Sequence, residues 1–222
     1  MTEQHDNERA PRERLLIAVD GPAASGKGTI ARALARHFDL PHMDTGVLYR
    51  AVALNLWRWG GDMSSEFEAL RACDVAAVDP QDPELRTEAV SSIASRISAY
   101  PSVRTALLDR QRQFAGQPGG AVLDGRDIGT VVAPDADAKL FITASAEIRA
   151  QRRVRELLER GLPAHYEDVL VDIRARDERD TNRAAAPLAR AEDALLLDTS
   201  ELDVDGAIAE AIRLVEQRLA VG

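Results

Sequence analysis

The sequence predicts an α/β fold in which a parallel sheet is covered by helices on both faces. Short apolar runs recur along the chain, and each is followed by a stretch whose apolar residues have helical spacing. Strands that alternate with helices in this way pair in parallel, and the helices bury both faces of the sheet. A length of 222 residues with 45% hydrophobic residues fits one globular domain that has room for insertions.

The first half of the chain begins with a strand and a helix. Residues 15–19 are uncharged and predict a buried strand, after which Ile30, Leu34 and Phe38 share one helical face. Residues 40–44 predict a short second strand. The elements expected after it are a helix over 48–59 that ends at Gly60, an irregular segment over 62–83, and helices over 84–99 and 101–114.

The second half continues the alternation of strands and helices. Apolar runs predict buried strands at 121–123, 140–143 and 194–197, and helical spacing predicts helices at 147–160, 166–177 and 208–219. In parallel sheets, ligands bind beyond the carboxyl ends of the strands. A binding site is therefore expected near the polar residues that follow the apolar runs, namely Asp20, Asp44, Asp124, Thr143 and Asp198.

Residues 21–27 have the spacing G-x-x-x-x-G-K of a phosphate-binding loop. The glycines let successive backbone N–H groups turn inward around one anion, and the helix that follows adds the positive end of its dipole. The lysine reaches the β- and γ-phosphates as a point charge. Because the motif lies between an apolar strand and an amphipathic helix, it predicts a triphosphate site formed by Gly21, Pro22, Ala23, Ala24, Ser25, Gly26, Lys27, Gly28 and Thr29.

One position departs from the usual pattern of this loop, and it concerns magnesium. A hydroxyl residue usually follows the lysine and binds Mg²⁺, whereas here Gly28 follows it and Thr29 comes one position later. We therefore expect Mg²⁺ to be held mainly through phosphate oxygens and water. Asp124, at the end of another predicted strand, is the candidate outer-sphere anchor.

Arginines gather in four further segments near predicted loop and strand ends. The guanidinium fork suits phosphate, so these segments predict clamps for a second phosphate group, above all at Arg50, Arg126 and Arg183. Arg155 and Arg160 instead have an acid four residues away and are interpreted as members of surface ion pairs. The four segments are DTGVLYR at 44–50, DGRDIGT at 124–130, RAQRR at 149–153 and RDERDTNR at 176–183.

Composition narrows the class of partner. The formal net charge is -9 and the isoelectric point is near 5.0, whereas a protein that binds long nucleic acids is usually basic.

Cys73 is the only cysteine, which excludes an intrachain disulfide and a cysteine-based zinc site. Residues 1–14 lack the apolar core of a signal peptide, and no apolar run approaches the length of a membrane span. We expect a cytoplasmic protein with a frayed N-terminus.

Six stretches of the chain together resemble bacterial cytidylate kinases, of the adenylate-kinase-like group of nucleoside monophosphate kinases. They are GPAASGKGT, DTGVLYR, VRTALL with RQRQF, DGRDIGTVVAPDA, RDERDTNRAAAPL and DALLLDTS, in the expected order. The resemblance implies a three-layer P-loop kinase fold with a central five-stranded parallel sheet. It implies one domain over 1–222, with a core of 14–44, 120–149 and 169–222, an acceptor-binding insert at about 45–119 and a lid at about 150–168.

The same resemblance implies a (d)CMP kinase, which transfers the γ-phosphoryl group of ATP to CMP or dCMP with Mg²⁺ and forms CDP or dCDP. It places Arg50, Arg126 and Arg183 on the acceptor phosphate, and Arg176 and Asp180 at the sugar hydroxyls. Thr45 stands where many members carry Ser, and the segment from 73 to 88 is shorter than in members that have a β hairpin there. The remaining implied site residues are Thr45 and Tyr49 beside the acceptor, Ser95, Arg104 and Asp127 at the cytosine, and Arg149 and Arg153 where the lid begins; the implied catalytic groups are Lys27, Arg126, Arg153 and Arg183.

Alternatives remain open on the sequence. A GTPase-type switch shares the phosphate loop but reads guanine with N-K-x-D, and here Gly26 and Ala138 precede Lys27 and Lys139. A non-catalytic ATP-binding protein would not need arginine clusters around a second phosphate site. Within the enzyme class, UMP and AMP kinases are the second choice. The expected partners are small molecules, without nucleic acid or membrane, and the expected state is a monomer.

Overall fold

The computed structural model describes residues 14–221, and the terminus predicted to be frayed lies outside the described residues. Within that range the strands form one five-stranded sheet in the order β2-β3-β1-β4-β5, and every neighbouring pair is parallel. The predicted parallel sheet is therefore confirmed. The strands are β1 Arg14–Asp20, β2 His42–Asp44, β3 Gly119–Gly125, β4 Ala138–Thr143 and β5 Leu195–Asp198.

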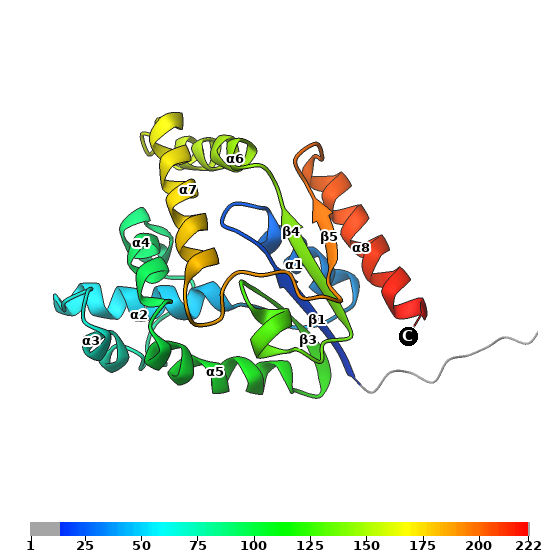
Figure 1. The fold of residues 1–222 in the computed structure, drawn as a ribbon, viewed down its shortest axis with the longest axis horizontal. Helices are drawn as coiled ribbons and strands as arrows, with labels where there is room; N and C mark the ends of the chain where they lie inside the picture. The colour runs from blue at the N-terminus through cyan, green and yellow to red at the C-terminus, as the bar shows by residue number, and fades with distance from the viewer. Residues whose placement is uncertain (1–13, 222) are drawn as a thin grey trace, which may run out of the picture.

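Helices cover the sheet on both sides and make three layers (Figure 1). On one face Ile17 and Val19 of β1 pack with α1 (Lys27–His37) and α8 (Val204–Val221). On the other face Leu16 and Ala18 pack against α5 (Pro101–Ala115) and against η2, a π-helical turn at Ile128–Val132. Successive residues of β1 thus serve opposite faces, as the twofold period of a strand requires.

A second group of helices lies beside the sheet, at the left of Figure 1. Its own apolar core includes the buried Leu54, Leu56, Leu85, Ile97 and Leu107. The described residues between β2 and β3 form helices and loops without a strand. The elements here are α2 Thr45–Trp59, α3 Glu66–Arg71, η1 Pro83–Arg86 (a 3₁₀ helix) and α4 Glu88–Ile97, followed by α5.

Two predictions for this region were wrong. Segment 62–83 was expected to be irregular, but it contains α3, whose Ser65 hydroxyl accepts a hydrogen bond from the Glu68 amide at 3.3 Å. Of the three apolar residues in α3 only Ala69 is buried, whereas Phe67 is 69% and Leu70 40% exposed, so the helix has no broad apolar stripe to reveal it. The helix expected from Glu84 starts at Glu88, because a 3₁₀ turn and the capping hydroxyl of Thr87 come first.

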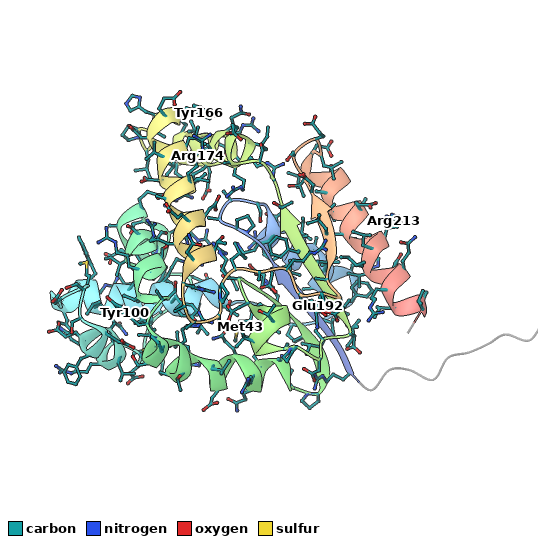
Figure 2. The ribbon with its side chains drawn as sticks, viewed as in Figure 1. Met43, Tyr100, Tyr166, Arg174, Glu192 and Arg213 are labelled. Atoms are coloured by element: carbon teal, nitrogen blue, oxygen red, sulfur yellow. The ribbon has the colours of Figure 1, made fainter. Side chains whose placement is uncertain are left out.

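The helices α6 (Ala146–Glu159) and α7 (Tyr166–Asn182) follow β4 and pack against each other (Figure 1). Arg174 of α7 donates to the Glu147 carboxylate of α6 at 2.6 Å, and Figure 2 shows Arg174 beside this helix pair. The helix α7 runs five residues beyond the predicted end at Asp177. No helix among residues 14–221 is both long enough and apolar enough to cross a membrane.

Candidate active site

The loop between β1 and α1 has the backbone of an anion cradle. A Cβ atom on Gly21 would lie 2.1 Å from the Ile142 carbonyl oxygen, so only glycine fits there. Gly26 caps α1 with φ +88°, a conformation that glycine adopts without strain. The Ser25 hydroxyl is buried and has no hydrogen-bond partner in the described structure. An unpaired buried donor is costly, so the loop is suited to an anion that would accept from it.

Lys27 is the first residue of α1, and its ammonium group donates to the Pro22 carbonyl at 3.4 Å. Burial, and secondly the positive charge of Arg126, lower the pKa of Lys27 to about 7. Phosphate groups bound in the loop would counter both effects, because they bring negative charge to the ammonium. The strand, loop and helix therefore place a cation where the sequence predicts the phosphates.

A cavity of about 770 Å³ extends from this loop to α2, α4 and α7. It brings together most of the predicted site residues, although they come from distant parts of the chain. The predicted site residues that do not line the cavity are Gly21, Pro22, Ser25, Gly26, Thr29 and Arg149. The predicted residues that line the cavity are Ala23, Ala24, Lys27, Gly28, Thr45, Tyr49, Arg50, Ser95, Arg104, Asp124, Arg126, Asp127, Arg153, Arg176, Asp180 and Arg183.

The same cavity is lined by a cluster of arginines with carboxylate partners. Arg50 donates to Asp44 at 2.7 Å, and Arg126 donates through Nε to Asp180 at 2.8 Å. Burial opposes ionisation of Asp180, but the charges of Arg126 and Arg176 hold its pKa below the usual value. The clustered positive charge exceeds the negative charge of these acids, which suits a phosphate group.

Two donors of this cluster have no protein partner. The Nε atoms of Arg50 and Arg176 are buried and unpaired in the described structure. Burial, and then the charge of Arg126, lower the pKa of Arg176 to about 10, so that its guanidinium stays cationic at neutral pH. Buried charged donors without acceptors indicate an anionic ligand at this end of the cavity.

Asp127 is the centre of a further group at the acceptor end. Its carboxylate forms an ion pair with Arg104, and Arg183 approaches the other oxygen at 3.5 Å. The Arg104 guanidinium lies over the Tyr49 ring, 5.8 Å from its centroid. Ser95 of α4 accepts from Arg179 at 3.5 Å. The group thus offers both acceptors and donors, as recognition of a flat heterocycle requires.

The surroundings of Asp124 fit the predicted outer-sphere role in holding Mg²⁺. One carboxylate oxygen of Asp124 contacts His42 Nε2 at 2.7 Å. The other lies 3.8 Å from where a Cβ on Gly28 would be, at the start of α1. Residues 14–221 contain no cluster of three or more acidic, histidine or cysteine side chains that could hold a metal ion. A magnesium ion here would therefore take most of its ligands from phosphate and water.

Two arginines of α6 make different contacts: Arg149 contacts the phosphate loop, whereas Arg153 lines the cavity. Arg149 is buried, forms a bidentate ion pair with Asp177 at 2.9 and 2.6 Å, and donates to the Ala23 carbonyl at 3.3 Å. Arg153 lines the cavity and pairs with Glu88 and with Glu156. The predicted surface pair between Glu156 and Arg160 is present at 3.8 Å.

Several residues of the site were missed by sequence reasoning. Arg179 lines the cavity, and Arg152 binds the Thr199 hydroxyl at 2.9 Å beside Gly26. Both lie inside arginine-rich segments, but nothing in the spacing separates them from surface arginines. His42 lies in a predicted strand, and its contact with Asp124 depends on the pairing of β2 with β3.

The sequence matches a family model and named relatives that all carry the name cytidylate kinase. Residues 17–217 match the family model for cytidylate kinase. A protein named cytidylate kinase from Xanthobacter autotrophicus is 58% identical over 93% of this chain and 99% of its own length. Another of that name, from Methylocella silvestris, is 56% identical over 91% and 94%.

Among solved structures, a gluconokinase from Sinorhizobium meliloti has a TM-score of 0.55 at 13% identity, over 95% of this chain and 96% of its own. At that identity the likeness concerns the fold alone, and it supports the predicted P-loop kinase fold. The extent and level of the sequence matches show that the chain belongs to the cytidylate kinase family.

Proposed function

We propose that the protein transfers the γ-phosphoryl group of ATP to CMP or dCMP, forming ADP and CDP or dCDP, in pyrimidine nucleotide metabolism. The observation that carries this proposal is that one cavity is lined both by residues of a phosphate cradle and by arginines with unpaired buried donors. One anion site alone would suit a nucleotide-binding protein without catalysis. Two anion sites in one cavity suit transfer from one phosphate to another.

On the donor side, the backbone of residues 21–29 and Lys27 hold the triphosphate of ATP. The unpaired hydroxyl of Ser25 and the left-handed Gly26 support this assignment. Mg²⁺ bound to the phosphates would neutralise charge that develops during transfer. Asp124 would hold the ion indirectly, and the carboxylate oxygen that His42 does not contact is the one available for this.

On the acceptor side, Arg50, Arg126 and Arg183 hold the phosphate of CMP; all three line the cavity that Lys27 also lines. Arg176 and Asp180 bind the sugar hydroxyls. The remaining acceptor residues are Thr45 and Tyr49, which shape the pocket, and Ser95, Arg104 and Asp127, which bind the cytosine.

Catalysis in this arrangement is mainly positioning and charge neutralisation. Transfer through a loose transition state needs little covalent help, and the attacking atom is already a phosphate oxygen, so no strong base is required. Alignment of the reactants supplies on the order of 7–11 kcal/mol. Lys27, Arg126, Arg153 and Arg183 surround the transferred group and neutralise its charge.

Water competes with CMP as acceptor, so the site must close over its substrates. We assign closure to a lid at about 150–168, carried by α6 and the start of α7, and acceptor binding to the insert at about 45–119. Arg149 and Arg153 link this lid to the ATP phosphates, Arg149 through its contact with the Ala23 carbonyl. A monomer in the cytoplasm remains the expected state.

The proposal is tested by measuring ADP formation in a coupled assay with CMP, dCMP, UMP, AMP and GMP as acceptors. We expect rapid ADP formation with CMP and dCMP and slow formation with the other three. ADP formation that is independent of any acceptor would instead indicate an ATPase or a nucleotide switch. A preference for UMP or AMP would replace the proposed substrate.

Asp180→Asn is expected to weaken binding of the acceptor through its sugar. A hydrogen bond to an ionised group contributes about 1.5–3 kcal/mol, so kcat/KM for CMP should fall about 10- to 100-fold. The fall should be smaller with dCMP, which lacks the 2′-hydroxyl. Steady-state kinetics with both nucleotides measures this. Unchanged kcat/KM for both would remove Asp180 from the site, and equal losses would confine its role to orienting Arg126.

Binding of ATP is expected to take up a proton at Lys27 above neutral pH. Burial lowers the pKa of Lys27 to about 7, so at pH 8 most of this group is neutral before the phosphates bind and restore its charge. ATP affinity should therefore fall as pH rises, by at most about tenfold per pH unit above the pKa. Calorimetry at pH 8 in buffers of different ionisation enthalpy measures the uptake. Equal uptake by Lys27→Met would assign it to another group.

A further inference from the structure

Asp20 is a buried acid beside the site to which no role has been assigned so far. It ends β1, directly before Gly21, and only 5% of its surface is exposed. One carboxylate oxygen accepts from the Ile128 amide at 2.8 Å, and the other accepts from the Gly129 amide at 2.7 Å. These bonds join the first residue before the phosphate loop to a segment more than a hundred positions later in the chain.

The two amides belong to the start of η2, which directly follows Asp127. An aspartate before a helical turn usually caps the amides of that turn with its own side chain. Asp127 makes no such cap, with φ -146° and ψ 26°, and its carboxylate binds Arg104 and Arg183 instead. Asp20 therefore satisfies the donors that Asp127 would otherwise attract.

We propose that Asp20 is a positioning residue for base recognition: by capping Ile128 and Gly129 it leaves the carboxylate of Asp127 turned into the acceptor pocket. The inference rests on the proposed function, because it concerns how the cytosine-binding group is held. Both oxygens of Asp20 are needed, since each accepts from one amide. Space around it is small, as a Cβ on Gly129 would lie 3.3 Å from the Asp20 carboxylate.

Asp20→Asn tests this with little change in shape. An amide side chain has one accepting oxygen, and its NH₂ group would face an N–H donor. We expect one η2 amide to lose its partner and to compete for the Asp127 carboxylate. The dissociation constant for CMP should then rise about 10-fold or more, and the ratio of kcat/KM for CMP to that for UMP should fall. The dissociation constant for ATP, measured without acceptor, should stay close to that of the wild type.

Asp137→Asn is the matched control. Like Asp20, Asp137 accepts a hydrogen bond from a backbone N–H group. Its donor is the Leu16 amide of β1, at 2.8 Å, toward the end of the strand opposite Asp20. Removing it should lower the melting temperature without changing the CMP/UMP ratio. A merely structural role for Asp20 predicts the same pattern for both variants: lower stability and an unchanged ratio.

The double variant Asp20→Asn with Asp127→Asn separates positioning from an independent effect. If Asp20 acts through Asp127, its substitution should reduce the CMP/UMP ratio no further once Asp127 is changed. Additive losses of selectivity would overturn the proposal, as would an equal weakening of ATP and CMP by Asp20→Asn alone. Should that variant fail to fold, Asp20→Glu, which displaces the carboxylate, is judged by the same ratio. A wild-type protein without CMP turnover would instead overturn the proposed function.

Discussion

Lys27→Ala is expected to lower kcat by about 10²- to 10³-fold, because a lost donor to the developing charge of transfer costs about 2.7–4 kcal/mol. Lys27 begins α1 at the phosphate cradle, and no other lysine lies near it in the sequence. The fold should survive, because the side chain makes only a long hydrogen bond to Pro22. Initial rates of ADP formation with saturating CMP, together with the melting temperature, measure both expectations.

Arg213→Ala is the control for loss of a cation. Arg213 pairs with Glu210 on α8, and Figure 2 shows it on the outer side of that helix. It does not line the cavity. This variant should keep the full rate. A folded Lys27→Ala protein that also makes ADP at a near-normal rate would show that the loop does not stabilise the transferred phosphoryl group.

Asp127→Asn should cause a large loss of activity with CMP and a narrowed preference for CMP over UMP. A carboxylate accepts from the amino group of cytosine, whereas uracil presents an acceptor at that position. Loss of the charged hydrogen bond should lower kcat/KM for CMP about 10- to 100-fold. The pairing of Asp127 with Arg104 supports this, since Arg104 would donate to the ring of a base bound beside it.

The competing interpretation is that Asp127 only orients arginines. It pairs with Arg104 and also approaches Arg183, so its substitution changes the charge near the acceptor phosphate. That change acts on CMP and UMP alike, because both carry the same phosphate. The ratio of their kcat/KM values therefore isolates the contribution of the base. Equal losses with both nucleotides would make Asp127 a support for the arginines without a part in base recognition.

The fold was largely predictable because its signals are local. Uncharged apolar runs predicted the buried strands, and the glycine spacing between residues 15–19 and Ile30 predicted the phosphate cradle. The elements that were missed lack such signals. The short helix α3 exposes Phe67 to solvent, and η2 is a single helical turn whose first amides are capped by Asp20 of β1.

The candidate site was predictable as a set of residue types, and the structure brings most of them to one cavity. Their partners were mostly not predictable, since most contacts depend on which elements are neighbours. The pair of Asp44 and Arg50 is local, six residues apart, but Arg126 finds Asp180 on a distant helix, and His42 reaches Asp124 only because β2 lies beside β3. Sequence spacing predicts which arginines bind phosphate, but it does not show which acid each arginine will pair with.

The most direct test of the account follows the transferred group itself. The wild-type protein is incubated with CMP, Mg²⁺ and ATP that carries a radioactive γ-phosphate, and the products are separated. We expect the label to leave ATP and to appear in CDP, with little in inorganic phosphate, and to appear in UDP far more slowly when UMP replaces CMP at the same low enzyme concentration. Label that accumulates in inorganic phosphate, or that is transferred to UMP as readily as to CMP, would contradict it.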